Sequence, residues 1–227
     1  MQEPKKEYQK VINYLRKMIS EGNLKIGSRL PTERELSEKL CISRNSTREA
    51  LRTLEIMGVI ESKRGSGNYI TGDVAKPVSS MIDMMLLLEQ IGQDEICSFR
   101  RSLDKAICLS LLEQDIDIAT LKSIKASYEA SDYTQPINEQ IEADHAFHYA
   151  LIHATNNQLW IHIAEAIMHI YGNIIRIIMQ KADPLTLKTI SETHIQIIHA
   201  LIKRNRKECE KWIDCHYDIV DNELKRG

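Results

Sequence analysis

Residues 30–52 have the sequence LPTERELSEKLCISRNSTREALR, which predicts two short helices joined by a tight turn. Thr32 can cap the first helix, because Glu35 stands three residues later and can bond back to the amide of the cap. Leu36 and Leu40 lie one helical turn apart and give this helix an apolar face. A helix, a tight turn and a second helix are therefore expected here.

The second helix is predicted to begin after Ser43, a residue type that caps helices well. Its inward face is predicted to be formed by Thr47, Ala50, Leu51 and Leu54, and its outward face by Arg44, Asn45, Arg48 and Arg52. Arginine can make two bonds to guanine, asparagine can pair with adenine, and serine can reach a phosphate or a base. The pattern favours a helix for the major groove of DNA, and an amphipathic helix pair with a solvated basic face is the alternative.

Two β-prone runs follow, at residues 59–62 and 68–71. Between them lies Lys63-Arg64-Gly65-Ser66-Gly67, which predicts a basic, glycine-rich hairpin tip. A helical pair followed by such a hairpin is a winged helix, and the tip of the wing places cations beside the phosphate backbone. The hairpin therefore strengthens the DNA-binding interpretation.

Over about residues 5–72 the sequence resembles the DNA-binding domain of the GntR family of bacterial transcription regulators. The matching motifs are residues 30–36, Ser43-Arg44, residues 48–51 and Gly65-Ser66-Gly67. Together with the basic wing tip, the resemblance implies DNA contacts by Arg34, Ser43, Arg44, Asn45, Ser46, Arg48, Lys63, Arg64 and Gly65. The chain departs from the family at Cys41, where glycine is usual, and at Asn45-Ser46, so the operator sequence stays open.

Charge is distributed unevenly along the 227 residues. Residues 1–76 carry 15 basic and 10 acidic side chains, whereas residues 77–227 carry 15 and 22. This asymmetry predicts that only the N-terminal part touches DNA. The expected organisation is a winged helix domain at 1–72, a linker at 73–79 and a second domain at 80–227.

Five cysteines without a CxxC motif, a polar N-terminus and the lack of a long apolar run predict a cytoplasmic protein with reduced thiols and no membrane segment. From residue 79 onward the periodicity is helical throughout. Helices are expected near 79–91, 94–113, 116–131, 136–155, 157–181, 187–203 and 206–225. The fold class is therefore mainly α, with an N-terminal winged helix-turn-helix and a C-terminal all-α bundle.

Four polar residues can meet inside this bundle. Asp144 and His148 are four residues apart and leave one face of a helix, while His194 and His216 lie on later apolar helix faces. One carboxylate and three imidazoles suit a divalent transition metal such as zinc, nickel or manganese. The periodicity alone leaves another interpretation open, in which these are hydrogen-bonded core histidines and a surface pair.

The segment Asp144-His145-Ala146-Phe147-His148 resembles the Asp-x-x-Phe-His motif of the FCD domain, the effector domain of FadR-like GntR regulators. The resemblance covers about residues 80–220 and implies that Asp144, His148, His194 and His216 are metal ligands, with zinc the first candidate. It also implies that Arg100 points to the metal pocket and holds a carboxylate ligand. Asp104 stands where that domain usually has glutamate.

The sequence thus predicts a ligand-responsive transcription regulator, a repressor in the simplest case, that is not an enzyme. Its expected partners are a palindromic double-stranded DNA operator, a small organic acid and a second copy of the chain in a homodimer. A metal-dependent enzyme using the Asp/His/His/His cluster is one alternative, although no His-Glu-x-x-His or Gly-x-Ser-x-Gly motif accompanies the cluster. A constitutive DNA-binding protein with a structural helical domain is another.

Overall fold

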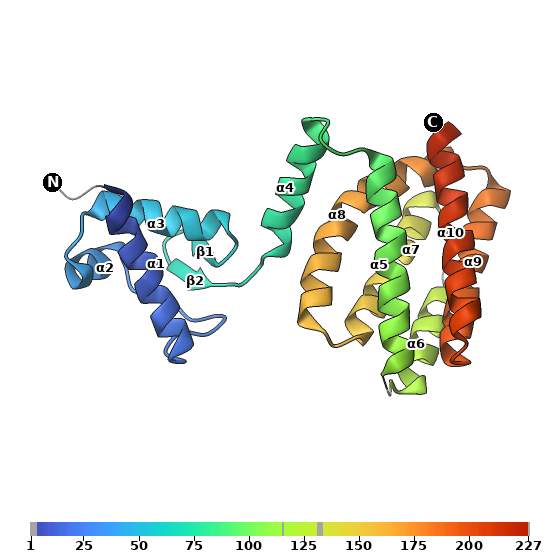
Figure 1. Ribbon diagram of the computed structural model, residues 1–227, viewed down its shortest axis with the longest axis horizontal. Coiled ribbons are helices and arrows are strands. Elements are labelled where there is room, and N and C mark those ends of the chain that lie inside the picture. The colour runs from blue at the N-terminus through green and yellow to red at the C-terminus, as the bar shows by residue number, and fades with distance from the viewer. Residues whose placement is uncertain (1–3, 115, 131–133, 227) are drawn as a thin grey trace. The chain divides into compact units, whose positions relative to one another are not determined.

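The computed structural model describes residues 4–114, 116–130 and 134–226. Within these residues the chain forms ten helices and one two-stranded antiparallel sheet, which confirms the predicted mainly α fold class (Figure 1). The chain divides into two compact units, residues 1–78 and 79–227. Each unit has its own apolar core.

The first unit contains three helices and a hairpin. In chain order these are α1 (Pro4–Ser20), α2 (Glu33–Leu40), α3 (Arg44–Ile56), β1 (Ile60–Lys63) and β2 (Gly67–Ile70). The core side chains come from every element, and Val11, Leu36, Ala50, Ile60 and Ile70 are among them. This shared core fixes α3 against the hairpin, so the recognition helix and the wing belong to one rigid body.

Local chemistry explains where α2 and α3 begin and end. Thr32 and Glu35 form the predicted capping box, and the Ser43 hydroxyl accepts a bond from the amide of Ser46 at 3.0 Å. Cys41 ends α2 in the left-handed conformation, with φ of 50°. Only glycine adopts that conformation without a steric penalty. The residue that departs from the family pattern therefore occupies the position where glycine fits best.

Helix α4 (Ala75–Leu87) begins inside the segment expected to be a linker. Pro77 lies in the first turn of this helix, where proline is tolerated because its missing N–H has no partner to lose. Ser79 is buried, and its hydroxyl donates to the carbonyl of Ala166 at 2.9 Å. Residues 75–79 of the expected linker are therefore helical, and α4 begins four residues before the predicted helix start at residue 79.

The second unit continues with six helices that surround one core (Figure 1). They are α5 (Gln93–Glu113), α6 (Ile118–Glu129), α7 (Ile137–Ala154), α8 (Gln158–Lys181), α9 (Pro184–Ile202) and α10 (Arg206–Arg226). Helix α9 begins three residues before the predicted start, because Asp183 caps it and Pro184 takes the first helical position. The predicted end of the α6 helix at residue 131 lies outside the described residues.

Helix α8 is long and apolar because it runs through the bundle. Among the described residues it alone has the length and composition of a membrane span, and 56% of the apolar window is buried inside the bundle. Its buried side chains, such as Ile167, Tyr171 and Ile175, face the other helices. A core helix accounts for the apolar run.

Candidate DNA interface and metal centre

The predicted DNA-contacting residues lie on α2, α3 and the wing, and all but one are exposed. The exposed ones are Arg34, Ser43, Arg44, Asn45, Arg48, Lys63, Arg64 and Gly65. Ser46 is the exception, with 8% of its surface exposed. Its hydroxyl donates to Glu7 of α1 at 2.8 Å, so Ser46 holds α3 to α1.

Arg48 of α3 is held by Glu33 of α2. Its Nη2 and Nε atoms donate to the two carboxylate oxygens at 2.7 and 3.2 Å. A paired fork of this kind restricts the guanidinium to one orientation. Glu33 was not singled out by the sequence, because only the fold brings it beside Arg48.

The wing is a hairpin with a tight tip. Ile60 pairs with Ile70 and Lys63 pairs with Gly67, so residues 64–66 form the turn. The ammonium of Lys63 lies 5.2 Å from the centre of the Tyr69 ring. Gly65 has φ of 74°, a value that a side chain would oppose. The tip therefore presents cations on a short, well-defined turn.

The four predicted metal-ligating residues converge in the second unit. Asp144 and His148 come from α7, His194 from α9 and His216 from α10, and one candidate ligand atom of each lies within 4.8 Å of the others. All four side chains are buried. The Nε2 atoms of His148 and His194 are 3.3 Å apart, and His194 Nε2 is 3.5 Å from Asp144 Oδ1. No other cluster of this kind occurs among the described residues.

Neighbouring side chains orient two of the imidazoles. His148 Nδ1 donates to Asp104 Oδ2 at 3.0 Å, because an ionised carboxylate can only accept. Thr193 gives its hydroxyl proton to the carbonyl of Ile190 and therefore accepts from His216 Nδ1 at 3.0 Å. Both rings consequently turn a bare Nε2 lone pair inward, and this tautomer assignment follows from the bonding network.

His194 is oriented by Tyr128 of α6. The two side chains share a hydrogen bond of 2.7 Å between the Tyr128 hydroxyl and His194 Nδ1. Tyr128 and Thr193 could not be identified from the sequence, because they stand 66 and 23 residues from the histidines they contact. Outer partners of this kind are typical of metal-binding histidines.

Burial decides the protonation of the centre. It lowers the pKa of His194 far below its ordinary value and lowers that of His216 to about 3, so both rings are neutral. Burial also raises the pKa of Asp144. For Asp104, burial acts in the same direction, but Arg100 and His148 outweigh it and hold the pKa well below its usual range. Neutral imidazoles are the form that binds metal.

The donor set fits a divalent metal. Both oxygens of Asp144 and the Nε2 of His216 are buried and have no hydrogen-bond partner among the described residues. A buried polar atom without a partner costs roughly 1–3 kcal/mol, and a charged one costs more. Three inward nitrogens and a carboxylate match the ligands of zinc and related ions. The cluster can therefore bind a divalent metal.

Arg100 and Tyr171 lie next to the cluster. The Arg100 side chain is fully buried, and its Nη1 lies 3.0 Å from Asp104 Oδ1. That approach is too poorly aligned for a hydrogen bond, and the Nε, Nη1 and Nη2 atoms have no hydrogen-bond partner in the described part of the chain. The guanidinium carbon is 5.8 Å from the centre of the Tyr171 ring.

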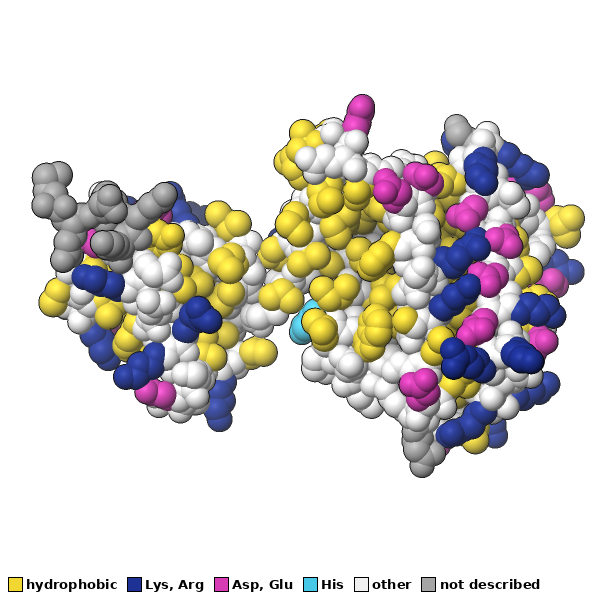
Figure 2. Space-filling model, viewed as in Figure 1, with side chains coloured by type: hydrophobic (Ala, Val, Ile, Leu, Met, Phe, Trp, Pro, Cys, Tyr) yellow, Lys and Arg dark blue, Asp and Glu magenta, His cyan; other side chains and the backbone are white. Residues whose placement is uncertain are grey.

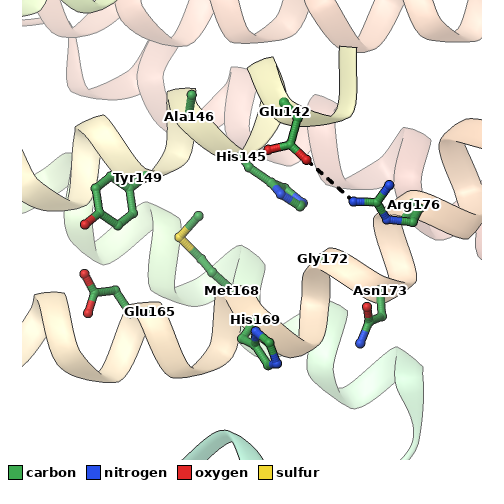
Figure 3. A pocket seen from close by; sticks show the side chains of 10 residues that line it. All are labelled: Glu142, His145, Ala146, Tyr149, Glu165, Met168, His169, Gly172, Asn173 and Arg176. Carbon is green, nitrogen blue, oxygen red and sulfur yellow. Dashed lines mark ion pairs between the residues drawn. The ribbon is translucent and has the colours of Figure 1, made fainter. Parts of the chain in front are cut away.

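Two other histidines, His145 of α7 and His169 of α8, line a separate surface cavity. The cavity, of about 540 Å³, lies between α7 and α8, and Figure 3 shows His145 and His169 in it together with the ion pair of Glu142 and Arg176. The ring of His145 lies against Gly172, where a Cβ atom would come within 3.0 Å of it. These histidines are separate from the metal cluster, as their positions in the sequence suggest.

A winged helix joined in sequence to a helical bundle with a buried polar centre defines a DNA-binding regulator with a sensing unit. Residues 7–70 match the bacterial regulatory proteins of the gntR family, and residues 95–219 match the FCD domain. The chain belongs to the GntR family of transcription regulators, in its FCD-containing branch. Ligand-responsive DNA binding is the function of this class.

Similar proteins cover nearly the whole chain. The "Uxu operon regulator" of Haemophilus influenzae is 31% identical, over 96% of this chain and 81% of its own length. The "HTH-type transcriptional regulator LutR" of Bacillus subtilis is 27% identical, over 91% of this chain and 96% of its own. The solved structure of "Streptococcus agalactiae GntR" has the same fold, with a TM-score of 0.69 at 21% identity over 95% of this chain and 99% of that one.

Proposed function

We propose that this regulator senses a small organic acid through a divalent metal held by Asp144, His148, His194 and His216. The observation that carries the proposal is the convergence of four buried metal-ligand side chains, of which Asp144 and His216 have inward atoms without a hydrogen-bond partner among the described residues. Zinc suits three nitrogens and one oxygen best, and nickel or manganese are the alternatives. When bound, the ion supplies a Lewis-acidic position for an oxygen of the effector.

The side chains of this unit hold the effector and the ion in place. Asp104 and Thr193 keep the Nε2 atoms of two histidines turned inward. Arg100 offers unused charged donors for a carboxylate. The effector then contacts α5 near the start of the unit and, through the ligand helices, α7, α9 and α10. It changes DNA affinity only if it binds one arrangement of the regulator better than another.

The DNA-binding form is proposed to be a homodimer on a palindromic operator, since one winged helix contacts too few bases for specificity in a genome. The proposed base and phosphate contacts are Arg34, Ser43, Arg44, Asn45, Arg48 and the wing tip. Ser46 is proposed to act by fixing α3 rather than by direct contact, because it is buried against Glu7.

An apolar surface over α4 and α8 is the proposed dimer contact. Figure 2 shows apolar side chains gathered there, whereas alternating basic and acidic side chains cover α5 and α10. The exposed apolar residues are Met81, Met84, Leu87, Leu88, Leu159, Ile163 and Ile177. An exposed apolar patch of this kind marks a contact surface.

Repression by occupying the operator, in the cytoplasm, is the simplest mode of action.

Metal analysis and DNA binding test the proposal together. The wild type is purified without chelators, its metal is identified by elemental analysis, and operator binding is measured with and without a panel of small organic acids. A His148→Ala/His216→Ala variant is expected to lose the metal and the acid response but to keep its circular dichroism and DNA binding. Full response in a metal-free variant would remove the metal from the sensing mechanism.

A further inference from the structure

A third extended segment lies beside the hairpin of the wing. Three backbone hydrogen bonds of 2.8–2.9 Å join residues 27–30 to residues 68–70. Arg29 stands opposite Tyr69 in this pairing, and Tyr69 stands opposite Glu61 on the other side of β2. Arg29 therefore belongs to the wing, although it precedes α2 in the chain.

Arg29 lies on the outer face of the wing. Residues that stand opposite each other in antiparallel strands point to one face, and the next pair points to the other. Ile60 and Ile70 form one pair and are buried in the core of the unit. The neighbouring pair of Glu61 and Tyr69, and with it Arg29, consequently faces outward. Arg29 is accordingly exposed.

Gly67 makes room for the guanidinium of Arg29. A Cβ atom at Gly67 would lie 3.2 Å from Nε, 3.5 Å from Nη2 and 3.8 Å from Cζ of Arg29. Gly67 also has φ of 111°, a value that a side chain would oppose. The guanidinium of Arg29 therefore lies against the backbone of the wing, at the residue where β2 leaves the tip.

Arg29 is the cation of this face that has no ion-pair partner among the described residues. The ion pairs described in the first unit involve the cations Lys17, Arg34, Arg48 and Lys63. Lys63 stands two residues after Glu61 and points the same way, and its ammonium is 3.7 Å from the Glu61 carboxylate. The pKa of the Glu35 carboxyl is lowered chiefly by bonds to Thr32, with a smaller contribution from Arg29. Glu61 thus balances Lys63, and Arg29 remains as the net positive charge.

We infer that Arg29 is a further phosphate-binding residue of the DNA interface, whose guanidinium donates two hydrogen bonds to one backbone phosphate beside the wing. The fork of a guanidinium matches two oxygens of a phosphate. A phosphate is favoured over a base because this guanidinium lies against the wing, whereas base edges lie inside a groove. Lys63, with Glu61 beside it, is then the weaker phosphate ligand. The inference rests on the proposed DNA interface of α2, α3 and the wing.

Salt-dependent binding of mixed-sequence duplex DNA to the full-length protein tests this role. Arg29→Met keeps an apolar stem and removes the charge. It is expected to weaken binding at low salt roughly tenfold, because a charge-assisted hydrogen-bonded contact is lost. The slope of log affinity against log salt is expected to fall by about one per bound chain. Arg16→Met, at an exposed arginine of α1, is the matched control and should leave the slope unchanged.

Arg29→Lys separates the charge from the packing against Gly67. It is expected to retain the salt slope of the wild type, because an ammonium also neutralises a phosphate. Both Arg29 variants are expected to melt at the wild-type temperature, since the side chain is exposed. An equal loss of slope in Arg29→Lys and Arg29→Met would assign Arg29 a structural role and overturn the inference. Weaker binding to a selected operator, with mixed-sequence binding unchanged, would also overturn it, because Arg29 would then read a base.

This inference and the proposed interface fail in different ways. If Arg44→Ala/Arg48→Ala weakens DNA binding but Arg29→Met changes neither affinity nor slope, the interface stands and Arg29 is no part of it. If neither variant changes DNA binding, the interface itself is wrong. No effector is present in these titrations, so their outcome is independent of the metal-based sensing.

Discussion

Glu33 and Arg48 are joined by two hydrogen bonds across the helix-turn-helix, at 2.7 and 3.2 Å. The pair occupies Nε and one proton of Nη2, and no hydrogen bond within the described part of the chain engages the Nη1–Nη2 edge of the guanidinium. That edge is the one that can make two bonds to guanine. Glu33 therefore fixes the orientation in which Arg48 can read a base.

Arg48→Ala and Arg44→Ala are each expected to weaken specific operator binding by about 1–3 kcal/mol. Affinity is also expected to fall steeply with added salt, because phosphate contacts release counterions. Fluorescence anisotropy with operator and scrambled DNA, at two salt concentrations, measures both effects. Operator binding by the Arg44→Ala/Arg48→Ala double variant at the wild-type level would show that α3 is not the DNA-recognition helix.

Glu33→Gln is expected to lower the ratio of specific to non-specific DNA affinity. The lost negative charge by itself would favour binding to any DNA, so a lower ratio would report the lost orientation of Arg48. The free arginine still attracts phosphate but is no longer aimed at a base. Glu49→Gln, an exposed change on α3 itself, is the matched control and should leave the ratio unchanged. A preserved ratio in Glu33→Gln would mean that Arg48 needs no orienting partner.

Asp104→Asn is expected to weaken metal binding roughly 10–100-fold, because His148 loses the carboxylate that fixes its tautomer. Thr193→Val makes the same test at His216 without removing a charge. Competition with a chromophoric chelator measures the affinities, and Asp214→Asn, at a surface partner of Lys105, is the control. Wild-type affinity in both Asp104→Asn and Thr193→Val would contradict the assigned tautomers.

The metal-free protein is expected to lose stability as the pH falls from about 6.5 toward 3. In this window the unfolded chain protonates its imidazoles, whose ordinary pKa is about 6.5. Burial lowers the pKa of His194 and lowers that of His216 to about 3, so the folded chain binds fewer protons and its free energy of unfolding decreases. Each such histidine contributes about 1.4 kcal/mol per pH unit.

Asp144 has the opposite effect on the free energy of unfolding as the pH falls. Burial raises its pKa, so the folded state takes up the proton at a higher pH than the unfolded state does. Denaturant unfolding in chelator at pH 7.5 and 5.0 measures the balance. His216→Gln should reduce the loss of stability, whereas His169→Gln, at an exposed ring, should not. An equal loss of stability between pH 7.5 and 5.0 in the wild type and in His216→Gln would contradict a buried neutral imidazole at His216.

The wild type is expected to sediment as a dimer at micromolar concentration. A Met84→Glu/Leu87→Glu variant is expected to sediment as a monomer and to bind a palindromic operator more weakly, because charges on the α4–α8 surface oppose association. Leu185→Glu places the same charge on an exposed leucine of α9 and serves as control. A monomeric wild type, with and without DNA, would refute the dimer.

Local chemistry made much of the first unit predictable. The capping box of Thr32 and Glu35 and the cap at Ser43 are short-range features, and both occur where the sequence places them. The start of α4 was predicted four residues too late, at residue 79 instead of 75, because Pro77 is compatible with the first turn of a helix as well as with a break. A short motif predicts a helix end reliably only where its residues are compatible with a single backbone conformation.

The candidate centre was predictable in part. Spacing placed Asp144 and His148 on one helix face and His194 and His216 on later apolar faces, and the family resemblance implied that these four are metal ligands. Tyr128 and Thr193 could not be found this way, because their roles depend on which helices are neighbours after folding. Such information is present only in three dimensions.

The unpaired atoms of Asp144 and His216 have a consequence for the lifetime of the protein. If the cluster binds the proposed ion, a chain that folds without it retains buried groups that favour opening, so a larger fraction of the molecules is unfolded at any moment. Proteases act on that fraction. The cellular level of the regulator would then follow the supply of the metal, and a starved cell would relieve control of the operator by losing the protein itself.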